Sequence, residues 1–375
     1  MTTNFEESIN INMVTTVTEK KEIYHFRYQI YIEEMSRPIA KVDHVNKLLY
    51  DELDEWGILL SAKIGSKLIA TARINIGTVH DFSQSEVKLL SLEEFQNCYS
   101  DDLEHKFALT TKIMIDPTQR SSQAFYLLLA KCYELCCQND VHFMFGICNS
   151  QLIRLYEKLG THRYGTNVFS SDYGLMIPIV LLIDDIQHLR KIRSPLFRIA
   201  RKRNTINSQT AEWFQTRFLK NSAVLNSQII TEEELWDVLC ERLADHPTKA
   251  ITLLSTLTIP EAKKFLHNCG SYVHCDAGNI ITTQGDISYT YNVLISGRLK
   301  SLTYLQPVKE YHIAGCHFGA NGLTEHVKHT EDIAVINSAE ILALSGIAFQ
   351  RFFHLHPDIA HKIVQNSKNP QKINY

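Results

Sequence analysis

A change in hydrophobic pattern divides this chain into two halves. In the first half, helix-like stretches alternate with short apolar runs, whereas the second half carries strand-like runs punctuated by glycines at 278, 285, 297, 315 and 319. A chain of 375 residues also exceeds what one ordinary hydrophobic core supports. The pattern therefore predicts an α+β protein with two domains, at residues 1–188 and 232–375. Residues 189–231 are predicted to form a basic helical linker.

The first half predicts a mixed sheet with flanking helices. A hairpin is expected over 56–77, because Gly65 and Ser66 separate two apolar runs. Further strands are predicted at 11–18, 107–117, 141–149 and 174–184, and helices at 21–35, 121–138 and 150–160. The second half predicts an entry helix after Glu232, a small β-roll, and a helix after Gly346.

Composition excludes several classes of protein. A formal net charge of -3 argues against a DNA-binding protein as a whole. No segment offers the roughly 18 uninterrupted apolar residues that a membrane-spanning helix needs. The start, MTTNFEESININM, lacks the basic residues and apolar run of a secretory signal. We therefore expect a cytoplasmic protein without a membrane span.

The nine cysteines show no repeated spacing, and their odd number argues against a disulfide framework. Cys132, Cys136 and Cys137 cluster on one predicted helix, and His142 follows. No Cys-x-x-Cys pair exists, so buried thiols are favoured over a zinc site. We expect no metal.

One segment is strongly basic although the chain is slightly acidic. Between 190 and 203 it carries seven cations and no acid: Arg190, Lys191, Arg193, Arg198, Arg201, Lys202 and Arg203. A solvated linker helix is one reading. A docking surface for an acidic acyl carrier protein is another, and peripheral contact with an anionic membrane is a third.

The first half contains two runs, MIDPTQRSSQAFYLLLA and FGICNSQLIRLYEKLG. The first is predicted to contain a strand, a turn with an arginine and a helix. The second is predicted to contain a strand, an asparagine and a helix with a tyrosine. This order resembles the donor site of GNAT acyltransferases, in which free backbone N–H groups of a splayed strand hold the pantetheine arm. The resemblance assigns donor binding to Ile113, Met114, Ile115, Arg120, Ser121, Ser122, Gln123 and Asn149.

The turn after this strand departs from the family pattern. Both glycines that normally close on the coenzyme A pyrophosphate are absent between Arg120 and Phe125. A carrier protein presents its phosphopantetheine thioester without that diphosphate. The resemblance therefore implies acyl carrier protein or acyl-CoA as donor, and the missing glycines favour the carrier protein.

A second resemblance lies in FRYQIYIEEM and YDELDEWGILLSAKIGSKLIATARI. These segments are similar to acyl-homoserine-lactone synthases and N-acyl amino acid synthases, a GNAT branch that uses long acyl chains. The resemblance places Arg27, Asp51, Asp54 and Arg73 in the site. The glutamate and arginine that the branch usually carries on its fourth strand are Leu109 and Lys112 here.

The expected chemistry is attack of an amine on a thioester carbonyl and departure of a thiolate. The resemblance implies that Tyr156 protonates the thiolate and that Asn149 binds the pantetheine amide. Core packing is the alternative for Tyr156, and a helix N-cap is the alternative for Asn149.

The general base is left open between four groups: Glu34, His44, Asp51 and Asp54. For Asp51 and Asp54 the alternative is a solvated loop, or an ion pair with Arg27 and Arg73. The two arginines are expected to orient an acidic group of the acceptor through bidentate hydrogen bonds.

The second half contains LLSTLTIPEAKKFLHNCGSYVHCDAGNIITTQGDISYTYNVLISGRLKSL. This run closely resembles the cyclic-nucleotide-binding fold. The segment that corresponds to the family's phosphate cassette begins Phe318, Gly319, Ala320. Ala320 stands where the family has a glutamate, and Asp332 falls at the place of an arginine. Since an acid there repels a phosphate, we expect no cyclic nucleotide to bind; the alternative is that Lys328, His326 or His329 replaces the arginine. A scaffolding, homodimerisation or sensing role is the expectation instead.

Together these features predict an N-acyltransferase. It would move a long acyl group from acyl carrier protein to a small amine or amino acid, with a C-terminal regulatory or assembly domain, a fusion that occurs in bacterial proteins. The alternatives are a non-catalytic signalling protein with degenerate sites and an acetyl-CoA-dependent protein-lysine acetyltransferase.

Overall fold

The computed structural model describes residues 8–99, 104–203, 208–220, 224–302 and 308–368. Within these ranges the chain forms two compact units. The first comprises Met1–Ile147, Leu159–Tyr164 and Pro178–Lys220. The second comprises Cys148–Lys158, Gly165–Ile177 and Asn221–Tyr375. Two segments from the first half of the sequence therefore group with the C-terminal roll, while the predicted domain boundaries at 188 and 232 stay a prediction.

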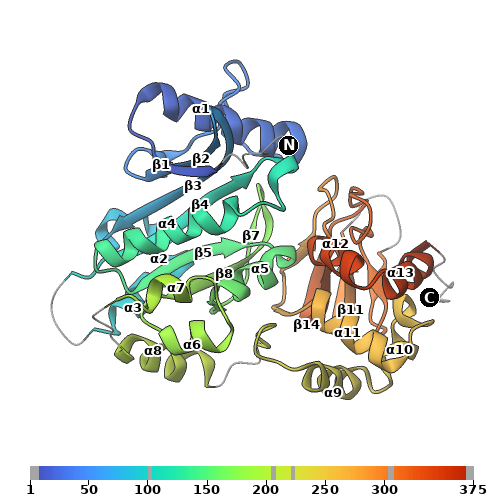
Figure 1. The fold of residues 1–375 in the computed structure, drawn as a ribbon. Helices are drawn as coiled ribbons and strands as arrows, with labels where there is room; N and C mark the ends of the chain where they lie inside the picture. Colours follow the sequence, from blue (N-terminus) through green and yellow to red (C-terminus); the bar gives the residue numbers. More distant parts are fainter. Residues whose placement is uncertain (1–7, 100–103, 204–207, 221–223, 303–307, 369–375) are drawn as a thin grey trace, which may run out of the picture. The chain divides into compact units, whose positions relative to one another are not determined.

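The larger sheet has the strand order β1-β2-β3-β4-β5-β8-β6, with β7 paired to β8 (Figure 1). Its strands are β1 Ile9–Met13, β2 Ile58–Ile64, β3 Lys67–Gly77, β4 Phe107–Ile115, β5 Phe143–Cys148, β6 Thr161–Arg163, β7 Val168–Ser170 and β8 Gly174–Leu182. Strands β1 to β4 pair antiparallel, and β4 pairs parallel with β5. The predicted mixed sheet, including the hairpin at Gly65 and Ser66, is confirmed.

Helix α1, Val17–Tyr28, begins four residues earlier than predicted, and β1 is correspondingly shorter than the predicted strand over 11–18. The cause is a capping box in which Thr16 and Glu19 satisfy each other's backbone N–H groups. The chain continues as a π-helical segment over Gln29–Glu34. On its buried side α1 packs Ile23 and Phe26 against Leu59, Leu68 and Met114 of the sheet.

Helix α4, Ala124–Gln138, lies along the strands of the sheet (Figure 1). Helices α2 Gln84–Leu90, α3 Leu92–Gln96 and α8 Ser208–Phe214 join a second core that the sequence patterns did not predict. Phe95 lies at its centre, with its ring centroid 4.7 Å from that of Phe145 and 5.1 Å from that of Phe218. Phe214, from the predicted linker, is fully buried in this core.

The second unit is built on a six-stranded antiparallel sheet of order β10-β14-β11-β12, with β13 paired to β11 and β9 paired to β14. Its strands are β9 Gly270–Cys275, β10 Ile280–Thr282, β11 Thr290–Ser301, β12 Glu310–Tyr311, β13 His317–Phe318 and β14 Ile333–Ser345. All five glycines that punctuate the second half of the sequence have a positive φ. At Gly297 a Cβ would lie 2.1 Å from the Ser338 carbonyl oxygen, so only glycine fits.

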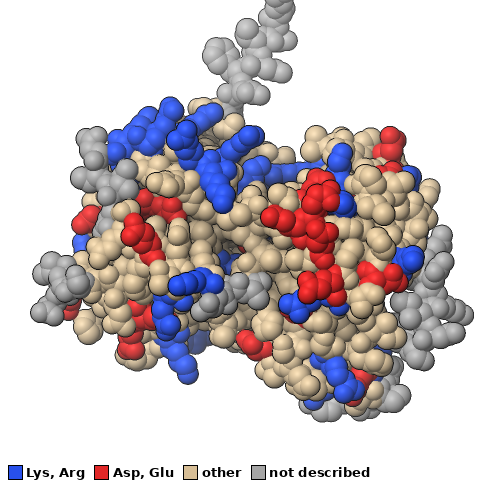
Figure 2. All heavy atoms as spheres, turned by 90° about the horizontal axis from the view of Figure 1, so that it is seen from below, with Lys and Arg blue, Asp and Glu red and all other residues tan. Residues whose placement is uncertain are grey.

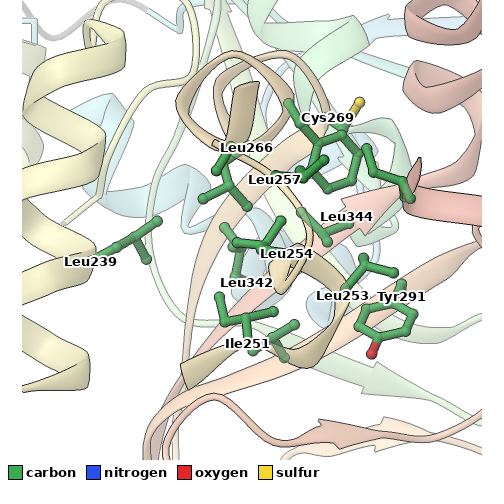
Figure 3. Close-up of a cluster of buried hydrophobic side chains, with 14 of the residues drawn as sticks. Leu239, Ile251, Leu253, Leu254, Leu257, Leu266, Cys269, Tyr291, Leu342 and Leu344 are labelled. Atoms are coloured by element: carbon green, nitrogen blue, oxygen red, sulfur yellow. The ribbon is translucent and has the colours of Figure 1, made fainter. Parts of the chain in front are cut away.

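Helices cover one side of this roll: α9 Glu232–Leu243, α10 Pro247–Ala250, α11 Ile259–Cys269, α12 Gly346–Leu355 and α13 Pro357–Lys368. Figure 3 shows leucines of α9, α11 and the intervening turn converging on Leu342 and Leu344 of β14. Capping boxes at Thr231 and Thr258 begin α9 and α11. The apolar entry helix predicted for the roll is thus present.

Candidate active site

Strand β4 changes its pairing halfway along its length. Its ladder with β5 joins Ala108 to Met144 and Leu109 to Phe145, whereas its ladder with β3 continues to Ile115. Lys112 adopts a positive φ of 52°, and the register with β3 shifts there, which marks a β-bulge. Beyond Leu109, the edge of β4 that faces β5 is therefore not used by the parallel ladder.

The predicted donor strand follows this bulge. Met114 is buried in the core beneath α1, while Ile113 and Ile115 are only half-buried. The strand leads into a 3-10 turn at Pro117–Gln119, which Asp116 caps by accepting the Thr118 N–H at 2.9 Å.

The predicted donor turn lies between this 3-10 turn and α4. Ser122 Oγ accepts the Ala124 N–H at 3.2 Å, whereas Gln123 makes no side-chain cap and Ser121 is exposed. Arg120 Nη2 donates to both carboxylate oxygens of Glu34, at 2.5 and 2.7 Å. The structure thus joins one predicted donor residue to one predicted base.

Four predicted residues meet in a buried ion cluster, which we call the Arg27 cluster: Arg27, Asp51, Asp54 and Arg73. Arg27 Nη1 donates to both oxygens of Asp54, at 2.8 and 2.9 Å. Arg73 Nη1 lies 3.0 Å from Asp54 Oδ1 and also binds Asp51. Of the alternatives for the two acids, the ion pair with both arginines is therefore confirmed.

Lys112 joins this cluster from the β4 bulge. Its Nζ lies 3.3 Å from Asp51 Oδ2 and 5.6 Å from the centroid of the Tyr31 ring. The neighbouring Thr111 Oγ1 accepts from Arg73 Nε at 3.1 Å. Sequence reasoning noted Lys112 only as a departure from the family pattern; a bulge, which rotates side chains locally, is not visible in a periodicity.

The charges of the cluster do not cancel. Arg27, Arg73 and Lys112 contribute three cations, and Asp51 and Asp54 contribute two carboxylates. Within the described part of the chain, Nε and Nη2 of Arg27 have no hydrogen-bond partner. One net positive charge with spare donors favours an anionic group nearby.

Burial opposes ionisation of Asp51, but Arg73 and Lys112 together hold its pKa below the ordinary value. Burial lowers the pKa of Arg27, and Asp54 opposes that shift. An ionised, doubly paired Asp51 is a weak base. His44, another candidate base, is exposed and its Nδ1 lies 3.1 Å from the Tyr28 hydroxyl.

Asn149 and Tyr156 belong to the second unit. Asn149 Nδ2 donates to the carbonyl oxygens of Tyr173 and Leu175, at 2.8 and 2.9 Å. Asn149 occupies the N-cap position of the following 3-10 turn, but its side chain makes no cap hydrogen bond there. A local pattern could not reveal partners more than twenty residues away. Tyr156 is half-buried on α5, Ile153–Leu159.

The polar groups around the cassette-like turn of the roll bond to one another. Ala320 N–H donates to His329 Nδ1 at 3.0 Å, and Asp332 Oδ1 accepts the Gln284 N–H at 2.6 Å. Burial lowers the pKa of His329 to about 4, which keeps the ring neutral and able to accept. Phe318 is buried and Gly319 has a φ of 72°.

The basic segment presents a cationic surface. Arg203 lies 2.7 Å from Asp184 Oδ1. The other six cations are exposed, and none has an ion-pair partner among the described residues: Arg190, Lys191, Arg193, Arg198, Arg201 and Lys202. Arg190 and Lys191 lie in α6, Ile186–Lys191, Arg198 lies in α7, Phe197–Ala200, and the others follow these two helices. Figure 2 views the molecule from the side of α6 and α8 and shows Lys and Arg side chains gathered in groups.

In the described ranges, no group of three or more His, Cys, Asp or Glu side chains is placed to hold a metal ion. Burial raises the pKa of the Cys132 thiol to about 12. All nine cysteines are free. None of the helices described there is long and apolar enough to cross a membrane.

No family model and no curated protein matches this chain. Among solved structures, FeeM, an N-acyl amino acid synthase from uncultured soil microbes, is similar over 51% of this chain and 98% of its own, with 12% identity and a TM-score of 0.40. The AHL synthase LasI is similar over 47% and 91%, with 12% identity and a TM-score of 0.36.

The roll has neighbours of its own. A cyclic-nucleotide-binding domain, PKAR CBD2 with bound Sp-2Cl-cAMPS, is similar over 37% of this chain and 87% of its own, with 22% identity and a TM-score of 0.28.

Proposed function

We propose that this protein is an N-acyltransferase that moves an acyl group from a carrier-protein thioester to the amine of a small acceptor bearing an anionic group. The observation that carries the proposal is the net positive charge of the Arg27 cluster, to which the β4 bulge contributes Lys112 beside the partly exposed Asp51. The strand that bears the bulge also offers the peptide edge beyond Leu109 for the thioester arm.

In this mechanism the acceptor's anionic group pairs with the cluster through charge-assisted hydrogen bonds. Asp51, whose side chain is 39% exposed, accepts a hydrogen bond from the attacking amine. Peptide N–H groups of β4 beyond Leu109 hold the pantetheine arm. The nitrogen forms the amide bond and releases its proton to solvent water, which afterwards returns a proton to Tyr156, and the carbon–sulfur bond breaks. Tyr156 then protonates the thiolate.

Three features support a carrier protein over acyl-CoA as donor. The turn from Arg120 to Gln123 lacks the glycines that would close on a diphosphate. Arg120 is itself engaged by Glu34. The six exposed cations of the basic segment complement an acidic partner, which raises the rate of encounter.

For the roll we propose a scaffolding role, because its cassette-like turn is closed by its own hydrogen bonds. The domain limits that go with this proposal are 1–188 and 232–375.

The test is turnover with matched donors. The purified chain, a long-chain acyl carrier protein or the same acyl-CoA, and a panel of amino acids and uncharged amines are combined, and N-acyl products are measured by mass spectrometry. We expect kcat/KM for the carrier protein to exceed that for the CoA at least tenfold, and carboxylate-bearing acceptors to be preferred.

Equal kcat/KM for both donors would reject the carrier protein as the preferred substrate. Preference for uncharged amines would reject the role given to the Arg27 cluster. If no combination of donor and acceptor gave an N-acyl product, acyl transfer would be rejected and a non-catalytic binding protein would be favoured.

A further inference from the structure

The helix that carries Tyr156 is held by the roll, within the second unit. Helix α5 lies far from the roll in sequence, yet Cys148–Lys158 and Asn221–Tyr375 form one compact unit. Among the hydrogen bonds that join the described residues of these two segments are three that we call the α5 tethers. Their sequence separations are 194, 116 and 70 residues.

The first two tethers meet the roll at one place. Ser345 Oγ donates to the Gln151 carbonyl oxygen at 2.9 Å, and Arg154 Nη1 donates to the Gly270 carbonyl oxygen at 3.0 Å. Gly270 begins β9 and pairs with Leu344, the residue before Ser345, at the end of β14. Both tethers therefore end on adjacent positions of the same antiparallel ladder, which is a rigid support.

The third tether involves Glu157, one turn after Arg154 on α5. Glu157 Oε2 accepts the Ser227 N–H at 2.8 Å, and both residues are buried. A neighbouring contact supports the arrangement, because Asn167 Nδ2 donates to the His274 carbonyl oxygen of β9 at 2.7 Å. The roll thus also holds the segment that follows α5.

The spacing of the tethers leaves one side of the helix for Tyr156. Arg154 and Glu157 of α5 are three residues apart, which places them about 60° from each other around the helix axis, whereas Gln151 lies in the preceding 3-10 turn, Ser150–Leu152. Tyr156 is two residues beyond Arg154, or about 200° around the helix axis. Arg154 therefore binds the roll from a side of α5 that Tyr156 does not share.

We infer that the C-terminal roll sets the position of the Tyr156 helix through the α5 tethers, with Arg154 as the principal positioning residue. Only the catalytic consequence of this inference rests on the proposed acyl transfer, because the hold on α5 can be measured without it.

The experiment compares Arg154→Gln, Arg154→Lys and a matched control, Arg298→Gln, in the full-length chain. Arg298 lies on β11 of the same roll but is exposed and pairs with Glu310. For Arg154→Gln we expect kcat to fall about tenfold with the donor KM within twofold of wild type. Arg154→Lys should recover part of this loss, and Arg298→Gln should match wild type.

Hydrogen exchange of the amides of residues 150–158 gives a second readout that needs no activity. It should be at least severalfold faster in Arg154→Gln and unchanged in Arg298→Gln. Unchanged exchange in Arg154→Gln would overturn the hold of the roll on α5. Faster exchange in Arg154→Gln with a wild-type kcat would overturn the inference that the position of α5 matters for the catalytic role of Tyr156. If wild type forms no N-acyl product, the proposed function fails, and hydrogen exchange alone decides whether the roll holds α5.

Discussion

Replacing Asp54 by Asn should destabilise the protein strongly, although the two side chains have nearly the same size. Asp54 is 3% exposed, and its carboxylate receives both hydrogen bonds of Arg27 Nη1 and lies 3.0 Å from Arg73 Nη1. Arg27 and Arg73 are 0% and 1% exposed. Without Asp54, Asp51 would be the sole carboxylate of the cluster for these two buried cations.

Breaking one partner of a buried ion pair costs about 3–5 kcal/mol, because the other charge is left uncompensated. An exposed pair is worth about 1 kcal/mol or less. The matched control is therefore Glu33→Gln, whose partner Lys47 lies 2.8 Å away with both side chains about half exposed. The structure predicts a difference of at least about 2 kcal/mol between the two variants.

The assay is urea unfolding, followed by far-ultraviolet circular dichroism and by fluorescence. Trp56 reports on the first unit, since its ring centroid lies 5.3 Å from that of Phe82. The double variant Arg27→Met with Asp54→Leu should lose much less stability than the sum of its single changes, because both charges leave together. Additive losses, or equal effects of Asp54→Asn and Glu33→Gln, would refute the reasoning.

Four further outcomes are expected. Tyr156→Phe should lower kcat by about 10²-fold without unfolding the chain, and an unchanged kcat would assign Tyr156 to packing. Changing Arg198 and Arg201 to Glu should raise the KM for the carrier-protein donor, and added salt should weaken wild-type activity; a loss of liposome binding alone would favour a membrane partner instead. Burial lowers the pKa of His329 from 6.5 to about 4, so the unfolded state binds a proton that the folded state lacks between these values. Stability should be full above pH 6.5 and fall toward pH 4, and His329→Asn should make that slope shallower in urea titrations at stepped pH. Millimolar cyclic AMP should leave the melting temperature unchanged, because the Ala320 N–H is engaged by His329; a clear rise would contradict the closed cassette.

The secondary structure of this protein is largely a local property, and most of it follows from the sequence. Alternating apolar residues predict the β2–β3 hairpin, and five glycines mark the turns of the roll where φ is positive. The start of α1 could also have been found, because Thr16 and Glu19 have the spacing of a capping box. Pairing of the acids with the arginines of the Arg27 cluster was one of the alternatives that the sequence left open for Asp51 and Asp54.

Tertiary structure alone decided which distant groups meet. The sequence around α5 does not reveal that Arg154 binds the Gly270 carbonyl oxygen or that Ser345 binds the Gln151 carbonyl oxygen. These contacts depend on how β9 and β14 pair in the folded roll. Likewise, the bulge at Lys112 arises from its pairing with β3, and the ring of His329 reaches Ala320 only when the roll is folded. Periodicity and capping act over a few residues, so the sequence determines the elements. Contacts across 100 residues depend on the packing of whole elements, and they decide which side chains form a site.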